Sequence, residues 1–291
     1  MENQKDDILM KPRSSRGCIG AGYRLYTGNF KRIFRYSWVA AIVYALVCSA
    51  GGTLMVLRPQ AALFTIGIIL VAEALFASYG FAVLKQHQTT GAISLTSKWF
   101  NIDTPIFIRT LKCWLCVAAI LLGAGALVGG ISLGAVKLLS PYTALGCIGL
   151  VSLVAAGLLL PLMYIVPRYI LNSGVGFWSQ FRAGYPVGMR RWGFLFTVGF
   201  VVTLVQTGLA LITSLPASIL TLANMSSTQS LMMGDASGMP SYIGWLAAAT
   251  FLLIGFIQAY VQLSALFPTY YMYGSIDMQE QERNEFKVKS E

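Results

Sequence analysis

Charged residues are scarce in this sequence. Asp, Glu, Lys and Arg together make up 11% of its 291 residues, whereas a soluble globular protein carries roughly 25%. So few charges cannot cover a surface that faces water, which excludes a soluble enzyme. Hydrophobic residues make up 56% of the chain, which excludes a disordered protein. The composition therefore predicts an all-α, polytopic membrane protein.

Side chains that hold metals or perform catalysis are also few. The single histidine, His87, cannot form a zinc cluster alone. Four of the five cysteines lie in or beside apolar runs, so no disulfide framework is expected. Cys113 and Cys116 have the spacing of a redox or metal pair, but without a second pair we interpret them as two small apolar residues on one helix. We expect no cofactor, no metal and no enzyme activity.

Six apolar stretches are long enough to cross a bilayer, which takes about 20 residues. The predicted spans cover residues 37–57, 61–84, 113–136, 142–166, 192–215 and 242–267. Short connectors after the first and third spans predict helical hairpins, so we expect three hairpins. The expected organisation is a disordered basic segment over 1–19, a six-helix membrane domain over 20–270 and a charged tail over 271–291.

Basic residues predict the orientation of the spans. All but Arg58 and Lys137 of the 21 lysines and arginines fall in the N-terminal segment, the loops after the second and fourth spans, or the C-terminal tail. Cytoplasmic loops of membrane proteins carry an excess of such residues. We therefore predict a multi-pass protein of a bacterial cytoplasmic (inner) membrane with both termini in the cytoplasm. The first 36 residues hold no apolar core, so we expect no cleavable signal peptide.

A basic, aromatic segment precedes each predicted hairpin and is typical of an amphipathic helix at the membrane surface. Asp103 or Thr104 can cap such a helix before the second hairpin, with Pro105 at its first position. The apolar faces comprise Tyr23, Tyr26, Phe30, Ile33 and Phe34 before the first hairpin, and Phe177, Phe181 and Tyr185 before the third.

These segments could recognise anionic lipid headgroups or an acidic partner, although a plain membrane anchor is the interpretation we favour. The candidate contacts with anionic lipid are Arg24, Lys31, Arg32, Arg35, Arg109, Lys112, Arg182, Arg190 and Arg191. Membrane lipids are the expected partners, a second copy of the chain or another membrane protein is a further candidate, and no nucleic acid is expected.

The third predicted span carries two pairs of glycines at four-residue spacing, Gly125 with Gly129 and Gly130 with Gly134. Small residues at this spacing let helix backbones approach closely in lipid. We predict that this span is a central packing helix within the chain. A homodimer contact through the same glycines is the alternative.

Glu73 is the only charged residue well inside a predicted span. A carboxylate there costs roughly 2.5–3.5 kcal/mol on insertion scales, and such residues are candidates for function. A cluster of Glu73 with Gln206 and Gln258 could form a proton or cation site, or it could be hydrogen-bonded glue between helices, which we favour. The candidate polar residues are Glu73, Thr203, Gln206, Gln258 and Gln262, with Thr213 beside them on the fifth span.

The stretch from the fourth to the fifth span resembles a known pattern. Leu160-Pro161 leads to Pro167-Arg168-Tyr169, and a later segment ends in Arg190-Arg191-Trp192. This order resembles a broad group of bacterial six-helix membrane proteins, which includes the membrane domain that precedes some glycerophosphodiester phosphodiesterases. The resemblance implies a six-helix membrane fold. It implies no catalytic residue, since the phosphodiesterase domain is absent.

Two functions remain open. The first is a non-enzymatic scaffold, accessory subunit or lipid-interacting component of the membrane. The second is a small transporter or channel that uses Glu73 and the glutamine and threonine side chains. A water-accessible cavity that reaches Glu73 would favour transport, whereas a dry, packed midplane would favour the first function.

Overall fold

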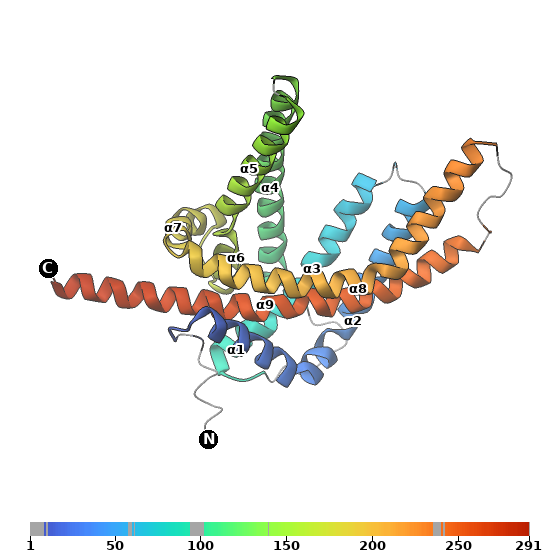
Figure 1. Ribbon diagram of the computed structural model, residues 1–291. Helices are drawn as coiled ribbons and strands as arrows, with labels where there is room; N and C mark the ends of the chain where they lie inside the picture. Colours follow the sequence, from blue (N-terminus) through green and yellow to red (C-terminus); the bar gives the residue numbers. More distant parts are fainter. Residues whose placement is uncertain are drawn as a thin grey trace.

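The computed structural model describes residues 9, 11–57, 60, 62–93, 102–138, 140–234, 240 and 242–290. All regular structure in these ranges is helical (Figure 1). The helices are α1 (Ser15–Gly28), α2 (Phe30–Leu57), α3 (Ala62–Thr90), α4 (Thr104–Leu138), α5 (Pro141–Leu159), α6 (Leu162–Leu171), α7 (Phe177–Arg190), α8 (Trp192–Met232) and α9 (Ile243–Ser290).

Six helical stretches are long and apolar enough to cross a membrane. They are Phe30–Val56, Phe64–Thr90, Thr104–Lys137, Pro141–Leu171, Trp192–Met232 and Ile243–Phe286. Each one overlaps one of the six predicted spans. The structure therefore confirms the predicted all-α polytopic membrane fold.

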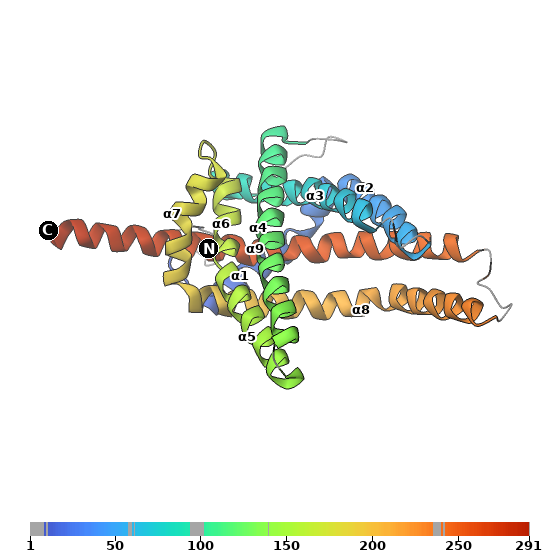
Figure 2. The ribbon, with the colours of Figure 1, turned by 90° about the horizontal axis from the view of Figure 1, so that it is seen from above.

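Neighbouring spans pair as α2 with α3, α4 with α5, and α8 with α9. The first and third of these hairpins lie together, because α2 packs along α9 (Figures 1 and 2). The α4–α5 hairpin diverges from them and points in another direction (Figure 2). In the most apolar stretch of 18 consecutive residues of α4, no residue is buried, so this hairpin is peripheral in the described chain.

Of the surface segments predicted before the hairpins, the third is a helix of its own, and the first is divided between α1 and the start of α2. α1 ends at Gly28 and turns at Asn29 into α2, and α7 ends at Arg190 just before α8. The second segment, residues 104–112, begins at the predicted cap, but it is the uninterrupted first part of α4 and not a separate surface helix. The backbone N–H of Ile106 donates to Asp103 Oδ1 at 3.3 Å, so Asp103 caps a helix that meets no break before the apolar span.

Three predicted boundaries differ from the structure. α1 begins at Ser15, inside the segment predicted to be disordered, because Ser14 Oγ accepts the Gly17 N–H at 3.2 Å and caps the helix. The earlier part of that prediction, residues 1–8 and 10, lies outside the described residues. α8 continues through Pro216 to Met232. α9 runs without a break across residue 270, where a charged tail was expected to begin.

The most buried part of the molecule is the segment of α9 from Phe267 to Ile276, which includes the start of that expected tail. The side chains of Tyr270, Tyr271, Tyr273 and Ile276 are 0% exposed. α1, α3 and α6 surround this segment. The core therefore lies where the ends of the spans meet the surface helices.

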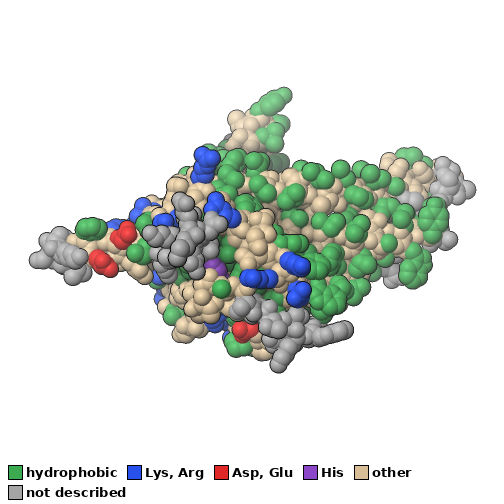
Figure 3. All heavy atoms as spheres, turned by 90° about the horizontal axis from the view of Figure 1, so that it is seen from below, with side chains coloured by type: hydrophobic (Ala, Val, Ile, Leu, Met, Phe, Trp, Pro, Cys, Tyr) green, Lys and Arg blue, Asp and Glu red, His purple; other side chains and the backbone are tan. Residues whose placement is uncertain are grey.

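Lysine and arginine side chains gather around this core, whereas hydrophobic side chains cover the part of the molecule that holds the far ends of the α2–α3 and α8–α9 hairpins (Figure 3). Lys137 lies at the far end of α4, and Arg58 lies outside the described residues.

Candidate functional site

The predicted intramembrane polar residues are divided among separate helix contacts. Gln206 on α8 donates through Nε2 to Ser264 Oγ on α9 at 3.0 Å. Gln258 on α9 donates to the hydroxyl of Thr213 on α8. Both hydrogen bonds hold α8 to α9, which is the glue function expected of such side chains in lipid.

Two further predicted residues lie apart from these pairs. Gln262 Oε1 on α9 accepts from the hydroxyl of Tyr44 on α2 at 3.4 Å, and Thr203 is exposed on α8. Gln262 thus joins α9 to α2, whereas Thr203 belongs to none of these pairs.

Glu73 is half-buried on α3. Within the described chain, no hydrogen bond or ion pair involves its carboxyl group. The carboxyl group is near enough to Tyr44 and Cys48 of α2 to interact with both side chains electrostatically. Gln206 and Gln258 find their partners elsewhere. The predicted cluster of Glu73 with these two glutamines is therefore not formed by the described hydrogen bonds.

The glycine pairs of the third span do not pack within the described chain, so that prediction is wrong. A Cβ built on Gly125, Gly129, Gly130 or Gly134 meets no atom within 4 Å. Glycine spacing shows where a helix could approach closely, but the divergence of the α4–α5 hairpin leaves this face without a partner helix.

Close helix contacts occur instead at glycines that the sequence did not single out. A Cβ on Gly22 of α1 would lie 2.4 Å from Pro268 N of α9. A Cβ on Gly255 of α9 would lie 2.9 Å from Cys48 Cβ and 3.2 Å from Ala45 Cα of α2. Gly22 has no glycine or alanine four positions away, whereas Gly255 and Ala259 have the small-residue spacing that could have marked this contact.

Some of the predicted lipid-contacting cations are used inside the protein. Arg109 on α4 donates through Nη2 to the carbonyl oxygens of Tyr169, at 2.5 Å, and Asn172, at 2.7 Å. Its guanidinium carbon also lies 4.5 Å from the centroid of the Tyr169 ring. Arg109 therefore satisfies carbonyls at the C-terminal end of α6, where a cation is favourable, and is a structural residue.

The other predicted cations differ in exposure. Arg190 Nη1 lies 3.9 Å from a Glu280 carboxylate oxygen, and Arg32 donates to the carbonyl of Ile93 at 3.2 Å. Arg191 is half-buried. The exposed members of the set are Arg24, Lys31, Arg32, Arg35, Lys112, Arg182 and Arg190.

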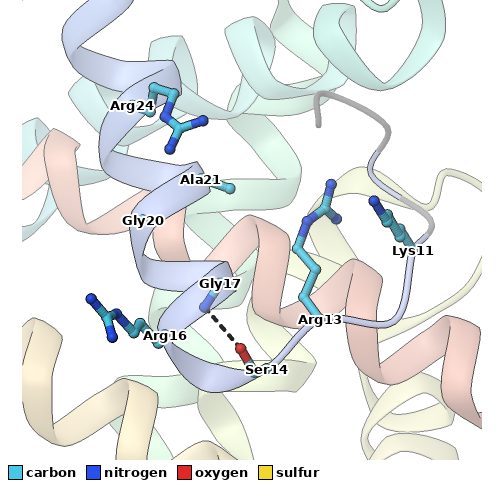
Figure 4. A pocket seen from close by; sticks show the side chains of 8 residues that line it. All are labelled: Lys11, Arg13, Ser14, Arg16, Gly17, Gly20, Ala21 and Arg24. Atoms are coloured by element: carbon cyan, nitrogen blue, oxygen red, sulfur yellow. Dashed lines mark hydrogen bonds between the residues drawn. The ribbon is translucent and has the colours of Figure 1, made fainter. Parts of the chain in front are cut away.

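A basic cavity of about 540 Å³ lies between α1 and the segment before it (Figure 4). We call it the α1 cavity. Its described lining includes four cationic side chains and no carboxylate. The lining residues are Lys11, Arg13, Ser14, Arg16, Gly17, Gly20, Ala21 and Arg24.

The α1 cavity is built by local structure. Ser14 caps α1, so the cavity borders the N-terminal end of a helix, where the backbone dipole favours an anion. A Cβ added to Gly20 would meet no atom within 4 Å, so the cavity is open at this residue. Figure 4 shows Lys11 and Arg13 on one side and Arg24 on the helix opposite.

The segment before α1 is fastened to α9. The Arg13 backbone N–H donates to Ser275 Oγ at 2.9 Å, and the Ser275 hydroxyl donates to the Arg13 carbonyl at 3.2 Å. The Arg13 guanidinium carbon lies 4.8 Å from the centroid of the Tyr271 ring. These contacts hold one wall of the α1 cavity in place on the buried segment of α9.

Cys18 directly follows Gly17, which lines the α1 cavity. It is 0% exposed, and its Sγ is 3.6 Å from the carbonyl oxygen of Tyr271. Burial raises the pKa of the Cys18 thiol to about 11, although the nearby Arg13 charge opposes the shift. The thiol is therefore neutral and shielded at physiological pH.

Of the cavity's cations, only Arg24 was among the predicted lipid contacts. Lys11, Arg13 and Arg16 fall in the segment predicted to be disordered, and their close spacing is the signal that could have marked them. Among the residues that the structure describes, no group of three or more His, Cys, Asp or Glu side chains could hold a metal ion.

Comparison of the chain with protein-family models, with curated proteins and with solved structures finds no match. The polytopic membrane character therefore rests on the length and composition of the six helices. The resemblance to the six-helix membrane domain that precedes some phosphodiesterases stays a prediction.

Proposed function

We propose that this protein is a non-catalytic, lipid-interacting component of a bacterial cytoplasmic membrane, and that it binds anionic headgroups in the α1 cavity. The observation that carries the proposal is the set of four cations around that cavity, at the capped N-terminal end of α1. Each lysine or arginine near an anionic leaflet contributes about 1 kcal/mol of attraction.

The orientation in this proposal has both termini in the cytoplasm. Lysine and arginine side chains gather around the buried core (Figure 3), which is the distribution expected of the cytoplasmic side. The α1 cavity then lies at the level of the cytoplasmic headgroups, where bacterial anionic lipids are available to it.

A small transporter or channel is the second candidate. Glu73 favours it, because a carboxylate in a membrane span is energetically costly and such residues are candidates for function. The hydrogen bonds of Gln206 with Ser264 and of Gln258 with Thr213 favour the first function, because these polar groups are used to join α8 and α9.

The test is lipid analysis of the full-length protein extracted with its native lipids by a membrane-solubilising copolymer. An Arg16→Gln/Arg24→Gln variant removes two cavity charges. A matched Lys31→Gln/Arg35→Gln variant removes two exposed charges of α2 that do not line the cavity.

We expect the cavity variant to lose most of the co-purified anionic lipid, roughly 30-fold in affinity at about 1 kcal/mol per charge. The control should lose much less. Equal retention by both variants and the wild type would contradict the proposal. Proton or cation flux in proteoliposomes that Glu73→Gln abolishes would establish transport instead.

A further inference from the structure

Two cavities follow one another along the α2–α3 hairpin, and both border the start of α4. The first, of about 560 Å³, is apolar, and its walls include Val43 and Val47 of α2, Ile68 and Leu75 of α3, and Phe107 of α4. We call the two cavities together the lateral slot. The name refers to their position at the side of the α2–α3 hairpin, where α4 diverges from α3 (Figures 1 and 2).

The second cavity, of about 390 Å³, has a mixed lining that includes polar and charged side chains, and we call it the polar cavity. It is lined by residues from the same three helices, among them Tyr36 of α2, Lys85 and Thr89 of α3, and Asp103 and Ile106 at the start of α4.

The apolar and polar cavities follow one another along the helices. Tyr36 precedes Val43 by seven residues, or about 10 Å of helix, and Lys85 follows Leu75 by ten. Ile106 lines the polar cavity and its neighbour Phe107 lines the apolar one. The lateral slot is therefore polar at the end of the spans and apolar toward their middle, as a phospholipid is.

The two charges at the polar end are both available to a ligand. No described residue forms an ion pair with Lys85, and the ion pairs described for the chain do not include Asp103. Asp103 uses one carboxylate oxygen to accept the Ile106 N–H at 3.3 Å. One cation and one anion thus face a common cavity without bonding to each other.

We propose that the lateral slot binds one diacyl phospholipid whose headgroup carries both a phosphate and a terminal primary ammonium group. Lys85 binds the phosphate, Asp103 accepts hydrogen bonds from the ammonium, and an acyl chain occupies the apolar cavity. The site and the headgroup charge both differ from those of the α1 cavity, so this inference goes beyond the proposed function.

The headgroup decides which lipid binds. An acyl chain gains little by leaving the bilayer for an apolar cavity, because lipid tails are as apolar as the side chains that line it. A charge-assisted hydrogen bond is stronger than a neutral one, and a trimethylated ammonium has no N–H to donate. Asp103 should therefore select the ethanolamine headgroup over choline, and Lys85 alone would not.

The experiment uses the full-length protein in phosphatidylcholine nanodiscs with a trace of phosphatidylethanolamine that carries a photo-crosslinker in its acyl chain. Unlabelled phosphatidylethanolamine, phosphatidylcholine and phosphatidylglycerol compete for the site. We expect crosslinks to the α3 segment 64–75 or to Phe107, and competition by phosphatidylethanolamine about tenfold stronger than by the other two lipids.

Asp103→Asn keeps a good helix cap and should make phosphatidylethanolamine and phosphatidylcholine compete equally. Lys85→Gln should weaken crosslinking about tenfold. Lys137→Gln, on an exposed residue at the far end of α4 outside the slot, is the control and should change nothing. Equal competition by all three lipids with the wild-type protein, or an unchanged ranking with Asp103→Asn, would overturn the proposal.

The Arg16→Gln/Arg24→Gln variant should leave this crosslinking unchanged, because its residues lie in the α1 cavity. Failure at the lateral slot is therefore distinguishable from failure of the proposed function.

Discussion

Replacing Gly22 by alanine is expected to displace α1 from α9. An added Cβ would lie 2.4 Å from Pro268 N, 2.5 Å from Pro268 Cα and 2.7 Å from the Phe267 carbonyl carbon. All three are backbone atoms, which cannot rotate away as a side chain can. Because an ordinary contact of this kind needs more than 3 Å, the two helices have to separate.

The expected magnitude is the balance of two effects. Overpacking at a close contact costs about 1–3 kcal/mol, whereas alanine in place of glycine stabilises a helix by up to about 1 kcal/mol. Gly20→Ala isolates the second effect, because a Cβ on Gly20 meets no atom within 4 Å. The two variants should differ by about 2 kcal/mol in the docking of α1, or roughly 30-fold in the docked-to-undocked ratio.

Cys18 reports on this docking, since its side chain is fully buried and its Sγ is 3.6 Å from the Tyr271 carbonyl oxygen on α9. The assay is the rate of maleimide labelling in a protein in which the other four cysteines are replaced by alanine. Gly22→Ala should label up to roughly 30-fold faster than the wild type, and Gly20→Ala no faster than the wild type. Equal rates for the two variants would refute the argued backbone contact.

Three further predictions concern the thiol, the α6 terminus and the α8–α9 contact. At pH 8 the thiol of Cys18, with a pKa raised to about 11, should react about 100-fold more slowly than a cysteine placed by Ser173→Cys in an exposed loop. Because the folded pKa is the higher one, this neutral thiol stabilises the protein below pH 9 and the contribution is lost as the pH rises through about 11; thermal unfolding of wild type and Cys18→Ala should therefore converge over that range. Arg109→Lys should lower the free energy of unfolding in detergent by about 1.5–3 kcal/mol, because lysine cannot replace the guanidinium that serves several carbonyls, and a loss no larger than that of Arg182→Lys would contradict this. Gln206→Leu should cost only about 0.6 kcal/mol, the average for a hydrogen bond between membrane helices, and a fully unfolded variant would show that the contact does more than join two helices.

The number and place of the spans could be predicted from sequence, because a helix that crosses lipid must satisfy its own backbone and expose apolar side chains over a fixed length. The ends of the helices were less predictable. The predicted fifth span ended at residue 215, yet α8 continues through Pro216 to Met232. A charged tail was expected after residue 270, yet its first residues belong to a buried segment of α9. Tertiary contacts decide such boundaries, and local composition does not report them.

The candidate site was only partly predictable for a related reason. The sequence identified Arg24 and Arg109 as equivalent basic residues of surface segments. In the structure Arg24 lines the α1 cavity, whereas Arg109 is bonded to carbonyls at the end of α6. Which cation faces a ligand depends on which helix ends lie within reach of it, and no sequence period carries that information.

Composition and hydrophobic length by themselves determined that this chain has six helices long and apolar enough to cross a membrane, because the energetic cost of placing backbone and charge in hydrocarbon acts on each segment independently. Only the tertiary structure decided that Gly22 is in close contact and the Gly125 stripe is not, that the glutamines bond to separate partners, and that basic residues far from the spans surround a cavity. Those features depend on distances between segments, and such distances exist only once the helices have packed.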